Sequence, residues 1–308
     1  MIRARRKDIF PLNLLGISIF LIMFTNCSLV KHQIFSSAGN FMITSMNSLY
    51  QEDDLQLAER FFSSNLKLIE LLAIQEPNNR AINLVAGQAF GAYAMAFVDD
   101  YDPERATRLF QRGLNYALRA LPPAHQFDQT ITPADLEKKL KNFKVKDVPA
   151  LFWIGYNWGS AILHNLDQPE YIADLAKVEM IMHRVLELDE KYNFGGVHLF
   201  YANYYAARPP FLGGDPVKGK EHFERSLVLT ANRFNLTKYY YARYYAVQTQ
   251  DLGLFDSLLT EIINTDLDQY PEIRLFNAIA RQKALLLYQE RENLFDIESQ
   301  SELPLKEE

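Results

Sequence analysis

The stretch from Gly195 to Thr230 constrains the fold most, because it has the pattern of two helices joined by a tight loop. Proline lacks the backbone N–H and clashes with the preceding turn, so Pro209 and Pro210 should end the first helix. Asp215 should cap the second helix through its side-chain oxygen, with Pro216 at the first helical position. A helical hairpin of this kind is the building unit of tetratricopeptide arrays.

Related pairs of helices recur along the chain. In a tetratricopeptide unit, small residues let two helices approach closely and aromatic residues fill the space beside them. The intervals between the small residues of the expected first helices are 61 or 65, then 47 or 43, then 40 residues, which exceeds the repeat length of a plain array. We therefore expect an all-α fold, a superhelical array of about four degenerate tetratricopeptide-like helical hairpins plus extra helices. The alternative is an irregular helical bundle. These small residues are Ala94, Gly155 or Gly159, Ala202 and Ala242.

Composition narrows the class of protein. The chain is 48% hydrophobic and 23% charged, which suffices for a sizeable core. Its net charge of −6 makes nucleic acid an unfavourable partner, since phosphate binding needs clustered cations. The single cysteine excludes an intramolecular disulfide, so packing must hold the fold.

The N-terminus has the pattern of an export signal. Basic residues precede an apolar run from about Ile9 to Phe24, which is shorter than a membrane-spanning helix requires. Cys27 follows directly and resembles the acylated cysteine of bacterial lipoproteins, although Asn26 and Phe24 depart from that motif. An uncleaved anchor helix is the alternative, and both interpretations place the body outside the cytoplasm.

The expected domain organisation has four parts. The helical periodicity begins near Leu55, and an acidic tail follows the last helix. We expect a lipoprotein signal peptide at 1–26, a lead-in linker at 27–54, a tetratricopeptide-like helical domain at 55–295 and an acidic tail at 296–308.

Seven short blocks of sequence occur in a fixed order: 147–153 (DVPALFW), 158–162 (WGSAI), 185–189 (VLELD), 204–209 (YYAARP), 212–216 (LGGDP), 222–227 (HFERSL) and 244–248 (YYAVQ). Together they resemble a known family, the T component associated with tripartite ATP-independent periplasmic (TRAP) transporters. The resemblance covers roughly Pro77 to Asn264. It implies a periplasmic lipoprotein with degenerate tetratricopeptide units, association with the substrate-binding P component, and a homotrimeric assembly anchored to the membrane by its N-terminal lipid.

Candidate ligand residues follow from the helical phase. The first helices of such arrays line the concave face. Successive residues are about 100° apart on a helix, so with Tyr241 in the core, Tyr239 should lie near the groove, one turn from Arg243. The alternative is that such aromatic stripes belong only to the core. The groove candidates are Gln88, Met95, Trp153, Tyr156, Asn157, Leu199, Asn203, Tyr239 and Arg243.

The loop of the Gly195–Thr230 hairpin is a second candidate region. Arg208, Gly213, Gly214 and Asp215 could form a docking edge for the P component or for another protomer. The structural alternative is that the glycines shape the turn while Asp215 caps the helix, and the residue types favour this alternative.

Enzymatic motifs are absent from the sequence. Its six histidines show neither the HExxH spacing nor cysteine partners of a metal site, and no GxSxG or GxxxxGK sequence is present. We therefore expect no catalytic residues, no metal and no cofactor.

Three functions remain open at this stage. We expect a periplasmic lipoprotein scaffold of a TRAP transporter that binds the P component, and with it a small apolar ligand, to aid uptake. A general tetratricopeptide adaptor for cell-envelope assembly is the alternative, and a helical envelope enzyme is the third.

Overall fold

A computed structural model describes residues 49–295, and every regular element in that range is a helical one. The prediction of an all-α fold is therefore confirmed. The predicted signal peptide, Cys27, most of the predicted linker and the acidic tail lie outside the described residues. None of the helices between residues 49 and 295 is both long enough and apolar enough to span a membrane.

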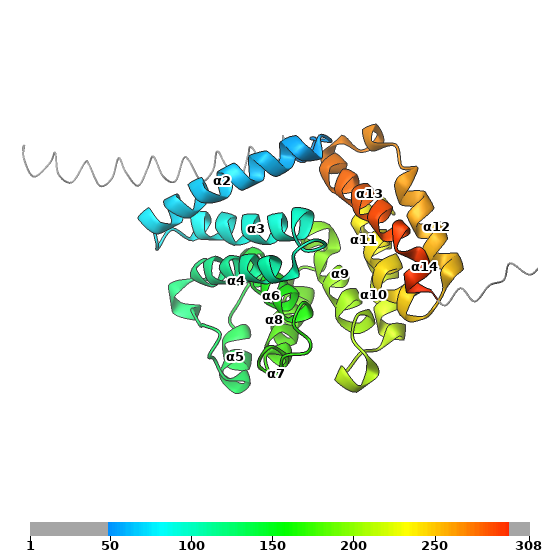
Figure 1. The fold of residues 1–308 in the computed structure, drawn as a ribbon. Coiled ribbons are helices and arrows are strands. Elements are labelled where there is room, and N and C mark those ends of the chain that lie inside the picture. The colour runs from blue at the N-terminus through cyan, green and yellow to red at the C-terminus, as the bar shows by residue number, and fades with distance from the viewer. Residues whose placement is uncertain (1–48, 296–308) are drawn as a thin grey trace, which may run out of the picture.

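The helices follow one another with short connections (Figure 1). They are α2 (Leu55–Gln75), α3 (Arg80–Phe97), α4 (Pro103–Arg119), α5 (Pro133–Leu140), α6 (Val148–Leu163), α7 (Pro169–Ile172), α8 (Leu175–Leu188), α9 (Tyr192–Ala206), α10 (Pro216–Leu229), α11 (Asn235–Tyr240), α12 (Leu252–Ile263), α13 (Arg274–Gln289) and α14 (Arg291–Leu294). A π-helical segment, Tyr241–Ala246, continues α11.

Local capping explains where several helices begin. The side chain of Asp215 accepts a hydrogen bond from the backbone N–H of Lys218, as predicted from the Asp-Pro pattern. Asp102 and Thr132 cap α4 and α5 in the same way, each with proline at the next position. These side-chain oxygens satisfy backbone donors that the first helical turn leaves without partners.

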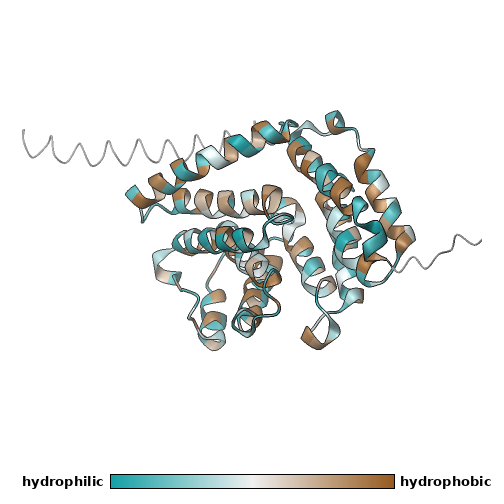
Figure 2. Ribbon diagram, in the orientation of Figure 1, coloured by the Kyte–Doolittle hydropathy of each residue, from teal (hydrophilic) through white to brown (hydrophobic). Residues whose placement is uncertain are grey.

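The helices pack as neighbouring pairs, α3 with α4, α6 with α8, α9 with α10, and the π-helical segment with α12. Small residues lie where the paired helices meet: Ala94, Ala202 and Ala242 are completely buried. A Cβ atom on Gly87 would lie 2.9 Å from the backbone nitrogen of Ala117, and one on Gly219 would lie 3.0 Å from the Cβ of Ala206. Figure 2 shows the apolar character of α3, which lies between α2 and α4 in this view. The tetratricopeptide-like character of the array stays a prediction.

The first turn of α9 is left-handed. Asn193, Phe194 and Gly195 have φ angles of 50°, 59° and 68°, a conformation that costs a non-glycine residue of order 1–3 kcal/mol. The Phe194 ring stacks on Phe234 at 4.8 Å and meets Phe276 at 5.4 Å. This burial offsets the strain and fixes the point where α9 enters the core.

The end of the helical domain returns to its beginning. The backbone N–H of Leu275, on α13, donates to the carbonyl of Tyr50 at 2.9 Å. Lys283, also on α13, bonds to Asp99 and Asp100 in the turn between α3 and α4. Figure 1 shows α13 beside the start of α2. The helices therefore enclose a space between the first and the last pairs.

A histidine pair fastens α9 to α10. The Nδ1 atoms of His198 and His222 lie 2.9 Å apart, and His198 Nε2 lies 3.1 Å from a carboxylate oxygen of Glu190, which also pairs with Arg225. Because the carboxylate only accepts, the network assigns the His198 proton to Nε2, and His222 then donates from Nδ1. Burial lowers the pKa of His222 to about 4, and His198 lowers it as well; burial also lowers the pKa of His198, against the opposing charge of Glu190.

Replacing Gly87 by alanine should destabilise the protein, because the added methyl group would press on the backbone of α4. We expect a loss of about 1–3 kcal/mol in the free energy of unfolding, measured by urea denaturation. Gly253→Ala is the matched control, because its Cβ would meet only Asp251 Oδ1 at 3.7 Å; its stability should be unchanged or slightly higher. Equal losses in both variants would contradict close packing at Gly87.

The free energy of unfolding should fall as the pH decreases from about 6.5 to about 4, because the unfolded chain binds a proton at His222 before the folded one does. His222→Leu should reduce this decrease in the free energy of unfolding by about 2 kcal/mol, a figure that allows for solvent screening at a half-buried site. Denaturation at several pH values measures the slope. The control His183→Leu removes an exposed histidine of α8 and should keep the wild-type slope; an unchanged slope in His222→Leu would refute the assignment.

Candidate functional site

The helices surround a cavity of about 140 Å³. Its walls come from α3, α6 and α9 on one side and from α11, the π-helical segment and α13 on the other. This volume is enough for several water molecules or part of a small organic molecule. A concave, mostly apolar space with a few convergent polar groups is the usual form of a small-ligand site.

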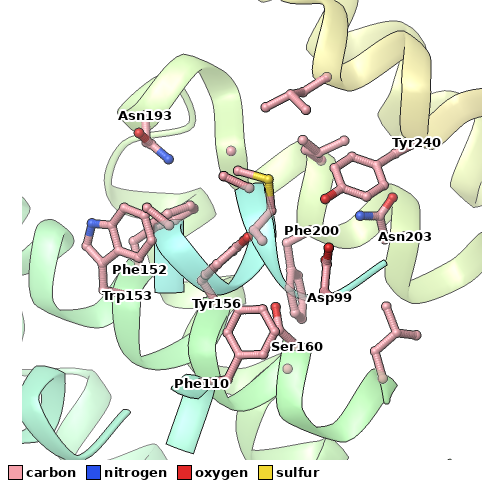
Figure 3. Close-up of a pocket in the computed structure, with 18 of the residues that line it drawn as sticks. Asp99, Phe110, Phe152, Trp153, Tyr156, Ser160, Asn193, Phe200, Asn203 and Tyr240 are labelled. Atoms are coloured by element: carbon pink, nitrogen blue, oxygen red, sulfur yellow. The ribbon is translucent and has the colours of Figure 1, made fainter. Parts of the chain in front are cut away.

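One part of the wall is aromatic (Figure 3). Phe152 packs edge-on against Trp153 at 5.3 Å and stacks on Tyr156 at 5.9 Å, while Phe110 meets Tyr156 at 6.1 Å. Phe200 from α9 adds a further ring. Because these rings brace one another, this wall is formed without a ligand.

Polar groups occupy another part of the wall. Figure 3 shows Asp99, Asn203 and Tyr240 reaching toward one region of the cavity, with the hydroxyl of Tyr156 also directed inward. Burial raises the pKa of both tyrosines, and the negative charge of Asp99 raises it further. Their phenols therefore stay protonated and can donate hydrogen bonds.

A balanced set of four charges lies behind the polar wall. Lys283 Nζ donates to Asp99 Oδ1 at 2.8 Å and also to Asp100 Oδ2, and Arg243 donates to Asp100 Oδ1 at 2.9 Å. The Lys283 side chain is only 3% exposed. Burial raises the pKa of Asp99 to about 6, while Lys283 opposes that shift; burial lowers the pKa of Lys283, but the two aspartates raise it overall.

Six of the nine predicted groove residues lie together around this cavity. They come from three helices, two residues from each, and a role in ligand binding stays a prediction. They are Gln88 and Met95 on α3, Trp153 and Tyr156 on α6, and Leu199 and Asn203 on α9.

The other three groove candidates lie outside the cavity wall. Asn157 is completely buried and donates to the carbonyls of Gly87 at 3.1 Å and Trp153 at 2.7 Å. Its amide therefore fastens α6 to α3. The Tyr239 hydroxyl accepts from Arg243 at 2.7 Å and donates to Asp100 at 3.3 Å, so both residues belong to the charge set behind the cavity.

Arg208 holds the loop predicted to dock a partner. Its guanidinium donates to the carbonyls of Tyr204, Leu212 and Gly213, and it lies 3.5 Å from the ring centre of Tyr204. Gly213 has a φ of 81°, and a Cβ atom on Gly214 would lie 1.8 Å from the Arg208 carbonyl oxygen, so the turn requires both glycines. Together with the cap that Asp215 makes, these contacts shape the turn; docking of a partner stays a prediction.

The sequence analysis missed Asp99, Asp100 and Lys283. Asp99 lines the cavity, yet its partner Lys283 lies 184 residues away along the chain. No local spacing could have joined them. It also missed Tyr240 and Tyr244, which line the cavity from the π-helical segment and the residue before it. Within residues 49–295, no group of three or more histidine, cysteine or acidic side chains is placed to hold a metal ion.

Comparison with known proteins gives two matches. The family described as the TRAP transporter T-component matches residues 51–295. An uncharacterized protein of Treponema pallidum (strain Nichols) is 27% identical over 255 residues, which cover 76% of this chain and 78% of that protein. The matched range contains the helices α2 to α14 and every residue that lines the cavity except Tyr50.

Replacing Lys283 by methionine should strongly destabilise the protein, because it removes a buried cation and leaves two partly buried carboxylates with Arg243 alone. We expect a loss of about 3–5 kcal/mol in the free energy of unfolding, measured by urea denaturation. Lys141→Met is the matched control, because Lys141 pairs with Glu137 on an exposed helix surface; it should cost less than about 1 kcal/mol. A Lys283→Met variant as stable as the control would contradict this account.

Proposed function

Because this chain belongs to the TRAP transporter T-component family, we propose that it is a periplasmic lipoprotein scaffold that holds a small apolar ligand and binds the substrate-binding P component. Association with a TRAP transporter follows from the family itself. The ligand, the P component as direct partner, the lipid at Cys27 and a homotrimeric assembly are the finer parts of the proposal.

The internal cavity is the observation that supports ligand binding. Its apolar wall offers the large hydrophobic contact area that a small molecule needs, and its few polar groups can orient one end of that molecule. The aromatic rings are already in place, so little conformational entropy is lost on binding.

The proposal assigns a binding role rather than a catalytic one. Asp99 is the acidic residue of the cavity, and Lys283 already occupies one of its oxygens. A general base acts on a nucleophile within hydrogen-bond reach, and a transport family gives no reason to expect such a pair. The cavity therefore fits a molecule that is held and released unchanged.

Purification of the full chain from its own membranes, after chemical crosslinking in intact cells, tests the partner. We expect a TRAP-type solute-binding protein among the crosslinked products, identified by mass spectrometry. Recovery of envelope-assembly proteins without a solute-binding protein would instead support the adaptor alternative and contradict the proposal.

Filling the cavity should remove the ligand while leaving the partner. Ala92 lines the cavity on α3, so Ala92→Phe should lower the amount of co-purified small molecule by at least about tenfold, at an overpacking cost of about 1–3 kcal/mol. Mass spectrometry of solvent extracts measures that amount, and circular dichroism checks the fold. Ala81→Phe places the same side chain on an exposed position of α3 and should keep both ligand and partner. Equal ligand content in the two variants would exclude the cavity as the binding site.

A further inference from the structure

We propose that the cavity selects a neutral ligand whose apolar body ends in a hydroxyl group, and that Asp99, Asn203 and Tyr240 recognise this group by hydrogen bonds. The inference rests on the proposed function, because it assumes that the cavity holds a small molecule. It adds the chemical class of that molecule and separates it from organic carboxylates and amines.

Asp99 offers one unused acceptor to the cavity. Lys283 bonds to Oδ1 at 2.8 Å, and Oδ2 makes no hydrogen bond with any residue in the range 49–295. The neighbouring Asp100 differs, because Arg243 and Lys283 bond to its two oxygens and it does not line the cavity. A ligand that enters the cavity therefore meets the free oxygen of Asp99.

Asn203 offers a second unused acceptor. Its Oδ1 atom is buried and has no hydrogen-bond partner within the described part of the chain. A buried polar atom without a partner costs about 1–3 kcal/mol, which a donor on the ligand would recover. Figure 3 shows Asn203 beside Tyr240, on the same side of the cavity as Asp99.

The third group is a donor. The Tyr240 hydroxyl makes no hydrogen bond with residues 49–295, and burial raises its pKa, so it keeps its proton. A hydroxyl group on the ligand can donate to Asp99 or Asn203 and accept from Tyr240 at the same time. A carboxylate cannot donate, and an ammonium cannot accept.

Charge balance disfavours an ionic ligand. Asp99 and Asp100 are matched by Lys283 and Arg243, so an ion placed beside these four charges would find no unmatched charge among them. Arg208 also lines the cavity, but its guanidinium already donates to three backbone carbonyls at the end of α9. A neutral head group avoids the desolvation cost that either ion would bring.

The experiment compares three probes that share one tail, octan-1-ol, octanoate and octylammonium, by titration calorimetry with the full chain at pH 7.5. We expect octan-1-ol to bind at least about tenfold more tightly than either ion. Octanoate or octylammonium binding as tightly as octan-1-ol would refute the inference and leave the proposed function standing. No binding of any probe would contradict the ligand part of the proposed function itself.

Asn203→Leu separates recognition of the hydroxyl from simple partition into an apolar space. If the cavity makes only apolar contacts with the alkyl chain, the added leucine should leave octan-1-ol binding unchanged or make it tighter. We expect it to weaken that binding by about fivefold, since one hydrogen bond is lost. Asn142→Leu, on an exposed residue after α5, is the control and should bind like the wild type. Unweakened binding to Asn203→Leu would refute the inference.

A second pair of variants tests Asp99 directly. Asp99→Asn and Asp100→Asn remove the same charge from the same set, but only Asp99 lines the cavity. We expect the preference for octan-1-ol over octanoate to fall at least about fivefold in Asp99→Asn and less than about twofold in Asp100→Asn. An equal fall in this preference in both variants would show an effect of net charge alone and would contradict a direct contact between Asp99 and the ligand. Thermal unfolding of both variants confirms that each is folded before titration.

Discussion

The pairing of Lys283 with Asp99 and Asp100 holds the end of the helical domain against its first helices. It joins α13 to the turn between α3 and α4, and Arg243 on the π-helical segment completes it. A buried ammonium is tolerated only where acidic partners and hydrogen bonds replace its hydration. The same four charges form the back of the cavity's polar wall, so the interaction that holds the two ends of the helical domain together also sets the chemistry of the space between them.

Small residues are the second determinant of the structure around the cavity, because they set how closely the helices can approach one another. Gly87 lets the backbones of α3 and α4 approach closely, and Gly91 and Gly113 leave room for the side chain of Asn157 on α6, which reaches a carbonyl of α3. Larger side chains at these positions would move α3 and α6 apart and widen the gap that the aromatic rings now fill. The cavity is therefore surrounded by closely packed helices.

Local signals in the sequence predicted most of the fold. The aspartates before Pro103 and Pro216 and the glycines at 213 and 214 act as expected, since each depends only on its near neighbours. Helical phase also predicted that Met95, Tyr156 and Asn203 would lie on one inner surface. An α-helix turns about 100° per residue, whereas the π-helical segment turns less per residue, so helical phase could not place Tyr244. The partner of Asp99 is set by tertiary structure alone.

The late position of α13 has a consequence for how the protein is made. The helix that completes the cavity begins at Arg274, near the end of the described chain, and its contacts reach back 183 and 184 residues. Loop closure over such distances is slow, and local hairpins form first. During folding, the side of the aromatic rings that lines the cavity therefore remains open to water until α13 has packed. A chain that stops before Leu275 would lack α13 and would leave this apolar surface exposed, which favours aggregation.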